Sequence, residues 1–404
     1  MKYIPLKTYY YNHNNEFEQE YQKRFNAPTT QHFNIEITQY NRTKSYSAFL
    51  CYSEDILQLT QQIYQAYAKL IKFEHTVPQI MLRQFALLSI LDEIKSTNDI
   101  EGVRSTKKEI REIMENQASV LKDTRLQSVV DKYIKILDNQ QFSFNSCQDI
   151  RNFYDSFALN EVVSHNPNHK PDGKIFRKDP VVITSGTDKT IHQGIWPEDK
   201  LISAMNNALS ILNNVNMPLL VRIAIFHYLF GYIHPFYDGN GRTGRFITSY
   251  YLAEEFGHII ALRISIIIKK HKNEYYKIFR DTDSEINRGD LTNFVIYFLQ
   301  MILETFNNAL PQLLRKKEQL IKYENIIANM QLKDETAKQI YSSLLYATLF
   351  YGEGLTIKQL MDATHKTRVT IQKRLDEMPK EHLSIFNETK PYRYKLNSML
   401  FKAE

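Results

Sequence analysis

The segment from residue 234 to residue 245 concentrates side chains that could carry out chemistry, and it reads His-Pro-Phe-Tyr-Asp-Gly-Asn-Gly-Arg-Thr-Gly-Arg. Glycines between two expected helices let main-chain N–H groups turn toward a ligand, and the start of the second helix adds free donors and positive potential. Arg242 and Arg245 share one side of a helical turn, so both guanidinium groups can face the same anion. The spacing predicts a cradle that suits a polyphosphate.

Two more side chains of this segment could supply a metal ligand and a base for a reaction. Asp238 is a hard oxygen ligand of the kind that holds Mg²⁺ beside phosphates, and His234 can accept a proton at neutral pH. Each feature alone has an ordinary explanation, because such residues usually cap helices, form turns or face solvent. Their combination within one short segment favours group transfer from a nucleoside triphosphate.

The segment resembles the signature of the Fic family, His-x-Phe-x-Asp/Glu-Gly-Asn-Gly-Arg-x-x-Arg, at every position. This resemblance implies an enzyme, a protein adenylyltransferase that moves AMP from ATP to a Tyr, Thr or Ser hydroxyl of a target protein or of itself. His234 would deprotonate the hydroxyl, Asp238 would hold Mg²⁺, and Arg245 would contact the γ phosphate. The ATP-binding positions that it implies are Gly239, Asn240, Gly241, Arg242, Thr243, Gly244 and Arg245, with Arg242 at the β phosphate.

One branch of the family, similar to the toxin Doc, transfers phosphate instead, carries Lys in the loop and lacks the last arginine. Gly241 and Arg245 of this chain favour nucleotidyl transfer. Further along, Tyr276 would pack on adenine and Asn287 would hydrogen-bond to it by the same resemblance. Ordinary core packing is an equal alternative for the tyrosine.

A β-hairpin is predicted over Lys174–Ile183, from two short β-prone pieces around Lys178-Asp179-Pro180. The resemblance makes it the flap on which a target protein docks through backbone pairing. The alternative is that this hairpin is an ordinary surface segment with no role in docking.

The stretch Thr97-Asn98-Asp99-Ile100-Glu101-Gly102 resembles the inhibitory helix motif of the family, Ser/Thr-x-x-x-Glu-Gly/Asn. The carboxylate of Glu101 would pair with Arg245 and keep it from the γ phosphate. The resemblance is to the class that is inhibited in cis by a preceding helix. In some relatives the same glutamate supports removal of AMP, so de-AMPylation is left open here.

The elements that must position these residues are mostly helices. Apolar periodicity predicts a mainly α fold, a Fic-type helical domain with a β-hairpin flap and a small C-terminal winged helix-turn-helix. A helix at 218–233 that is apolar nearly all round precedes the signature, and a helix at 243–256 follows it. Residues 1 to about 50 are polar and indicate an extended arm or a tail. The expected divisions are 1–115 with the inhibitory motif, 116–312 as the catalytic domain, 313–335 as a linker helix and 336–404 as the winged-helix module.

Composition limits the remaining alternatives. The chain has 404 residues, 43% of them hydrophobic, which is typical of a globular protein, and its two cysteines exclude a disulfide scaffold. No apolar stretch reaches the length of a bilayer crossing, so we expect a cytoplasmic protein that does not enter a membrane. Residues 338–404 hold 11 Lys/Arg against 7 acidic residues. This module could bind DNA or dock a protein, and the alternative function is a DNA-binding regulator whose Fic site senses nucleotide. A homo-oligomer is left open.

Overall fold

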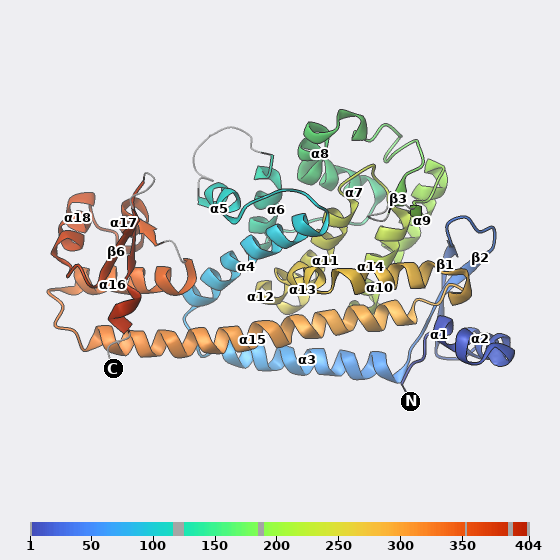
Figure 1. The fold of residues 1–404 in the computed structure, drawn as a ribbon, viewed down its shortest axis with the longest axis horizontal. Coiled ribbons are helices and arrows are strands. Elements are labelled where there is room, and N and C mark those ends of the chain that lie inside the picture. Colours follow the sequence, from blue (N-terminus) through green and yellow to red (C-terminus); the bar gives the residue numbers. More distant parts are fainter. Residues whose placement is uncertain (1, 116–124, 185–189, 352–353, 387–390, 402–404) are drawn as a thin grey trace. The chain divides into compact units, whose positions relative to one another are not determined.

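The computed structural model describes residues 2–115, 125–184, 190–351, 354–386 and 391–401 (Figure 1). The chain forms two compact units, the first from residues 1–69 and 89–307 and the second from residues 70–88 and 308–404. The expected divisions 1–115 and 116–312 therefore contribute mainly to one unit. Residues 116–124, where the second expected division begins, lie outside the described part of the chain.

Helices build most of the structure, which confirms the mainly α fold. In chain order, the helices up to the end of α15 are α1 Leu6–Asn12, α2 Phe17–Phe25, α3 Glu54–Glu74, α4 Gln79–Ile100, α5 Lys107–Glu115, α6 Gln127–Leu137, α7 Cys147–Tyr154, α8 Asn160–His165, α9 Glu198–Leu212, α10 Leu219–Ile233, α11 Asn240–Phe256, α12 His258–Ala261, α13 Ile264–Lys270, α14 Lys272–Asp283 and α15 Thr292–Ala328. A π-helical turn, Asp155–Leu159, joins α7 to α8.

Helices α10 and α11 form the core around the signature segment. Almost every side chain of α10 is buried, as its apolar sequence predicts. A Cβ atom at Gly244 would lie 3.1 Å from the ring of Phe230, so the glycine lets the two helices approach closely. Helix α11 begins at Asn240 and not at Thr243 as expected, because Gly239 adopts a left-handed conformation (φ 77°) and serves as its N-cap.

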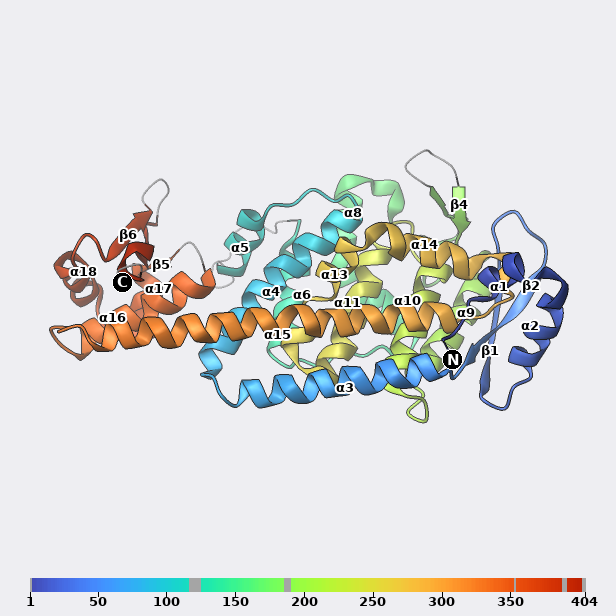
Figure 2. The ribbon, with the colours of Figure 1, turned by 60° about the horizontal axis from the view of Figure 1, so that its bottom comes forward.

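The expectation of an arm or tail for residues 1–50 is wrong, because this stretch forms two helices and an antiparallel hairpin, β1 (Thr30–Thr38) and β2 (Ser45–Cys51) (Figure 2). The buried side chains of β1 alternate with polar ones, which diluted the apolar signal. Main-chain bonds fix the hairpin to the helical body: the Phe49 N–H donates to the Gly289 carbonyl at 3.0 Å, and the Leu291 N–H donates to the Phe49 carbonyl at 2.9 Å.

The hairpin before the signature exists, but its predicted position at Lys174–Ile183 is wrong. Its strands are β3, Val182–Thr184, and β4, Thr190–Gln193. The Glu198 carboxylate accepts the main-chain N–H groups of residues 174–176 at 2.8–2.9 Å, which diverts these donors from strand pairing. Trp196 follows β4, is 51% exposed, and donates its indole N–H to the Lys178 carbonyl at 2.8 Å.

Over its described residues, the C-terminal part of the second unit has three α-helices and a three-stranded antiparallel sheet of order β5-β7-β6. Its elements are α16 Glu335–Tyr346, β5 Leu355–Thr356, α17 Ile357–Thr364, α18 Arg368–Glu377, β6 Leu383–Phe386 and β7 Arg393–Leu396. The winged-helix interpretation of this order stays a prediction. The expected linker helix is the last part of α15.

The described helices include none with both the length and the apolar character that a bilayer crossing requires.

Candidate active site

His234 ends helix α10 in an unusual backbone conformation. It occupies the left-handed region (φ 53°), and its Nδ1 atom lies 3.3 Å from the Gly231 carbonyl oxygen. Burial, and after it the neighbouring His192, lower the pKa of His234 to about 4. The imidazole is therefore neutral at pH 7, which is the form that can accept a proton.

A side-chain clamp holds the loop after His234. The Asn240 amide accepts the Phe236 N–H at 2.9 Å and donates to the Phe236 carbonyl at 2.8 Å. The buried ring of Phe236 stacks on Tyr154 with centroids 3.6 Å apart, and the Tyr154 hydroxyl donates to the Asp238 carbonyl at 3.1 Å. Asn240 therefore fixes the loop through its side chain, a role that the sequence interpretation did not include.

At the first turn of α11, where the phosphate cradle is predicted, the N–H group of Gly239 already has a partner. The Gly239 N–H donates to the Asp238 carboxylate at 2.5 Å, whereas the Thr243 N–H donates to the Gly239 carbonyl at 3.0 Å, within the helix. The donors of residues 240–242 are the ones that the first helical turn leaves for an anion. A Cβ atom at Gly241 would overlap the Glu101 carboxylate, so this carboxylate lies directly against the cradle.

Arg245 binds the turn that carries Glu101. Its guanidinium donates to the Thr97 hydroxyl at 2.8 Å, to the Thr97 carbonyl at 3.3 Å and to the Glu101 carboxylate at 2.6 Å. Burial opposes the charge of Arg245, but the Glu101 carboxylate outweighs it and raises the pKa of the guanidinium. Burial likewise opposes the charge of Glu101, and Arg245 outweighs it and lowers the pKa of the carboxyl. Both groups are ionised at neutral pH.

Arg242 has a buried partner that the sequence interpretation missed. Its side chain is 1% exposed and forms an ion pair with Glu161 of α8, whose side chain is 7% exposed. The Nε atom of Arg242 is buried without a hydrogen-bond partner in the described part of the chain. Nothing in the sequence around Glu161 distinguishes it from an ordinary helical glutamate. The contact of Arg242 with a β phosphate stays a prediction.

Asp238 is the candidate ligand for a metal ion. Its side chain is 43% exposed, and its Oδ2 atom lies 3.8 Å from Nδ1 of His169. The described residues contain no group of three or more His, Cys, Asp or Glu that could hold a metal ion by themselves. One accessible carboxylate fits Mg²⁺, which proteins commonly bind through one or two carboxylates together with substrate phosphates.

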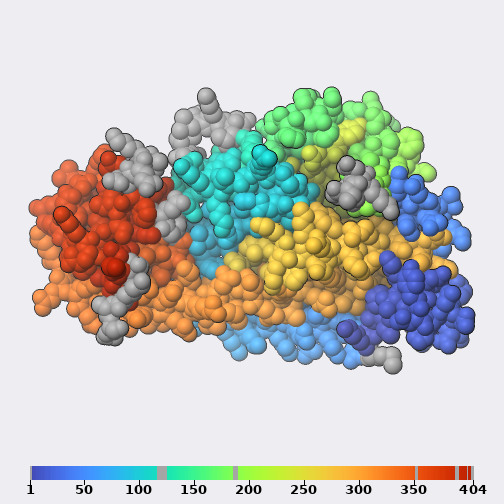
Figure 3. All heavy atoms as spheres, viewed as in Figure 1, coloured from blue at the N-terminus to red at the C-terminus, as the bar shows by residue number. Residues whose placement is uncertain are grey.

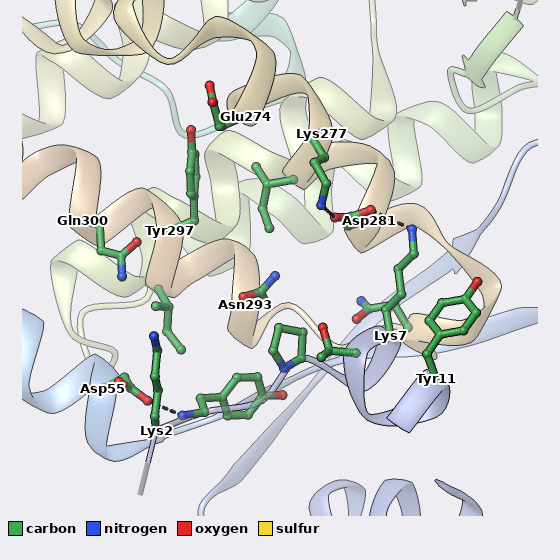
Figure 4. Close-up of a pocket in the computed structure, with 16 residues that line it drawn as sticks. Lys2, Lys7, Tyr11, Asp55, Glu274, Lys277, Asp281, Asn293, Tyr297 and Gln300 are labelled. Atoms are coloured by element: carbon green, nitrogen blue, oxygen red, sulfur yellow. Dashed lines mark hydrogen bonds and ion pairs between the residues drawn. The ribbon is translucent and has the colours of Figure 1, made fainter. Parts of the chain in front are cut away.

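The two residues expected at adenine lie in different surroundings. The Tyr276 hydroxyl donates to the Ile100 carbonyl at 3.4 Å, next to Glu101. Asn287 is tied to its own turn, because its amide donates to the Thr282 and Asp290 carbonyls at 3.1 and 2.7 Å. It lines a groove of about 540 Å³ between the N-terminal residues and helices α14 and α15, where Lys7 and Lys277 both approach Asp281 (Figure 4). Adenine binding by either residue stays a prediction.

Thr243 and Gly244 serve the helix packing in this structure. The Thr243 hydroxyl donates to the Gly239 carbonyl at 2.9 Å, and Gly244 faces Phe230.

Charged side chains of α4, α13 and α14 hold the turn that carries Glu101 in place. The Asp99 carboxylate pairs with Lys95 on its own helix and with Lys269 of α13 at 2.6 Å. Lys272 of α14 donates to the Asp99 carbonyl at 3.4 Å. Figure 3 shows the surface of α13 and α14, in yellow, adjoining that of α4, in cyan. The contacts from Lys269 and Lys272 join residues about 170 apart in the sequence, which gave no sign of them.

Comparison with known proteins finds a family match and a similar fold. The sequence profile of the Fic/DOC family matches residues 146–252. A Fic family protein from Desulfovibrio desulfuricans G20 shares the fold with a TM-score of 0.52 and 20% identity, over 85% of this chain and 96% of that chain.

Two more solved structures are similar over a smaller part of the chain. Fic-1 from C. elegans matches with a TM-score of 0.42 and 20% identity, over 63% of this chain and 72% of that chain. A Fic domain containing signaling protein from Bacteroides thetaiotaomicron VPI-5482 matches with a TM-score of 0.42 and 16% identity, over 63% and 95% of the two chains.

Proposed function

Because residues 146–252 of this chain form a Fic/DOC family domain, we propose that the protein is an adenylyltransferase that moves AMP from ATP to a hydroxyl of a protein side chain. The observation that carries the proposal is that one short loop joins the neutral imidazole of His234 to the main-chain N–H groups at the start of α11. A base and a phosphate cradle on one short loop are the two parts that nucleotidyl transfer to a hydroxyl needs.

The proposed reaction is a substitution at the α phosphorus of ATP. His234 accepts the proton of the target hydroxyl, and the hydroxyl oxygen forms a bond to the α phosphorus. The bond between the α phosphorus and the oxygen bridging to the β phosphorus breaks, and pyrophosphate leaves with the electron pair. The N–H groups of residues 240–242 and the guanidinium of Arg245 bind the phosphate oxygens. Mg²⁺, when bound, neutralises phosphate charge, and Asp238 would hold it.

We propose that Glu101 keeps the enzyme inhibited. Its carboxylate lies against the cradle and accepts a hydrogen bond from Arg245 at 2.6 Å. A γ phosphate needs the same guanidinium and carries the same sign of charge as the carboxylate. ATP and Glu101 therefore compete, and productive binding requires the turn of residues 97–102 to move.

Two labels on ATP test the transferred group. The Glu101→Gly variant is expected to incorporate label from ATP labelled at the α phosphorus, and none from ATP labelled at the γ phosphorus. Addition of His234→Ala to that variant is the matched control and should remove the signal. Incorporation of the γ label would show phosphate transfer and would contradict the proposal.

The target protein is proposed to dock beside the flap. Val182 of β3 is 49% exposed, and β3 and β4 pair with no third strand among the described residues, so the backbone of the hairpin can pair with an extended segment. Backbone pairing positions a hydroxyl with little demand on the sequence of the target.

The second candidate function is a DNA-binding regulator, and the exposed start of α18 favours it. Lys366, Arg368 and Lys373 are exposed there, whereas Arg374 is held by Asp334 and Glu377. Three phosphate contacts predict that log K falls with log salt concentration at a slope of about −3. A gel-shift titration with salt measures this slope, and the absence of any shift at low salt would eliminate this candidate.

A further inference from the structure

Arg177 is fully buried between the flap and the end of helix α10. Within the described part of the chain, its hydrogen bonds all go to main-chain carbonyls. Nε donates to His234 at 2.9 Å, Nη1 to Asp179 at 2.7 Å, and Nη2 to Ile195 at 3.0 Å and Ile233 at 3.5 Å. The guanidinium therefore joins both sides of the flap to the last residues of α10.

This buried charge is stabilised without a carboxylate. No acidic side chain lies within ion-pair distance of Arg177 in the described part of the chain, and burial lowers the pKa of its guanidinium to about 10. Part of the compensation comes from the C-terminus of α10, because the last carbonyls of a helix lack partners within the helix and carry partial negative charge. Such a cation is costly to bury, which points to a role beyond packing.

Gly194, next to strand β4, shows how closely Arg177 and His234 pack against the main chain that follows the hairpin. A Cβ atom there would lie 2.5 Å from Nη2 of Arg177 and 2.8 Å from Cβ of His234. The main chain on either side is also fixed, because the Gly194 N–H donates to Val181 and the Ile195 N–H donates to Ile233, both at 3.0 Å. Only glycine lets the guanidinium and the imidazole lie against the same stretch of flap.

We propose that Arg177 is a positioning residue that fixes the main chain of His234 relative to the flap, and so sets the distance between the base and the target hydroxyl. The role in transfer rests on the proposed function, whereas the placement of His234 does not. One bond from the rigid guanidinium goes to the carbonyl of His234 and another to the carbonyl of Ile233, while the other two go to Asp179 and Ile195 beside the hairpin. The guanidinium therefore ties the left-handed residue 234, a conformation that few non-glycine residues adopt, to the flap. Movement of the flap and movement of the imidazole are thereby coupled.

The positive charge of Arg177 also affects the protonation of His234. The charged and polar groups that act on this imidazole are His192 of β4, the Gly231 carbonyl, Arg177 and Glu101. His192 is itself paired with Asp283 at 3.2 Å. Arg177 lowers the pKa of His234 less than burial and His192 do, and loss of the guanidinium charge should therefore raise that pKa.

A titration of the histidine signals by NMR tests the proposal on the full chain. His234→Ala identifies the signal, and the variants Arg177→Gln and Arg177→Lys are then compared with the wild type. We expect Arg177→Gln to raise the pKa of His234 and Arg177→Lys, which keeps the charge but not the planar fork, to leave it near the wild-type value. In the Glu101→Gly background both variants should transfer AMP at least about tenfold more slowly, with an unchanged KM for ATP.

Arg151→Gln is the matched control. Arg151 donates to the Ile175 carbonyl at 2.7 Å in the same segment and pairs with Asp155 at 2.8 Å, but has no recorded contact with His234. Its replacement should leave both the titration and the transfer rate unchanged.

Wild-type titration and wild-type transfer in Arg177→Gln would overturn the proposal. If neither Arg177 variant folds, Gly194→Ala gives the same test, because its Cβ displaces the guanidinium from the imidazole while the charge remains. Slow transfer is then expected, and unchanged transfer would overturn the proposal. If Glu101→Gly alone transfers nothing, the proposed function fails, whereas the titration still decides whether Arg177 controls His234.

Discussion

Replacement of Glu101 by glycine should turn the enzyme on. The Glu101 carboxylate lies against the first turn of α11 and accepts a hydrogen bond from Arg245 at 2.6 Å. The Glu101→Gly variant removes both the charge and the volume at this position, and leaves the two bonds from Arg245 to Thr97 in place. Arg245 can then bind a phosphate without first losing a carboxylate.

The expected size of the effect follows from the bond that is lost. A hydrogen bond to a charged group contributes about 1.5–3 kcal/mol net. At ATP concentrations below saturation, release of this bond should raise transfer about 10- to 150-fold. Because Arg245 lowers the pKa of Glu101, the pair persists until the pH falls below the usual range of a carboxyl, so the inhibition should be constant across neutral pH.

Auto-modification with α-labelled ATP is the assay, with calorimetry for ATP affinity. Glu101→Gln keeps the volume and removes the charge, so it should give a smaller increase than Glu101→Gly. Glu254→Gln, which removes an exposed carboxylate from the same helix as Arg245, is the control and should transfer at the wild-type rate. Equal transfer and equal ATP affinity for wild type and Glu101→Gly would refute the reasoning.

Four further results are expected. His234→Ala should abolish transfer but keep ATP affinity in calorimetry, and retained transfer would exclude the base role. Because the pKa of His234 is about 4, the acid limb of kcat/KM should lie near that value, and a limb near the ordinary histidine value of about 6.5 would contradict it. Asp99→Ala should loosen the inhibitory turn and raise transfer by part of the Glu101→Gly effect, whereas Asp92→Ala, which breaks an exposed pair on the same helix, should change nothing. Glu161→Ala leaves a buried arginine unpaired and should lower the free energy of unfolding by about 3–5 kcal/mol in urea titration, with no loss contradicting the buried pair.

The helices around the site could be predicted because their sequences are strongly periodic or uniformly apolar. The helix expected at 218–233 is α10, which the structure begins one residue later, at Leu219. The N-terminal hairpin could not be predicted, because polar residues such as Asn34 and Glu36 alternate with its buried ones. The flap was misplaced because Glu198, more than twenty residues downstream of Lys174, takes the donors that strand pairing would have used.

Within the site, the sequence predicted the residues whose spacing is local. His234, Asp238 and Arg245 lie on one loop and one helix turn, and the Glu101 motif carried a resemblance of its own. Residues that contact this segment from elsewhere in the sequence could not be predicted from any sequence pattern. Glu161 is 81 residues from Arg242, and this contact exists only because the folded helices bring both side chains into one interior.

The position of Trp196 makes the flap observable without a label. It is the sole tryptophan of the chain, it follows strand β4, and it is about half exposed. Indole fluorescence depends on contact with water, so an extended peptide that covers this side chain would shift the emission to shorter wavelength. Intrinsic fluorescence can therefore follow docking on the hairpin in real time and separate the arrival of a target from its chemical modification.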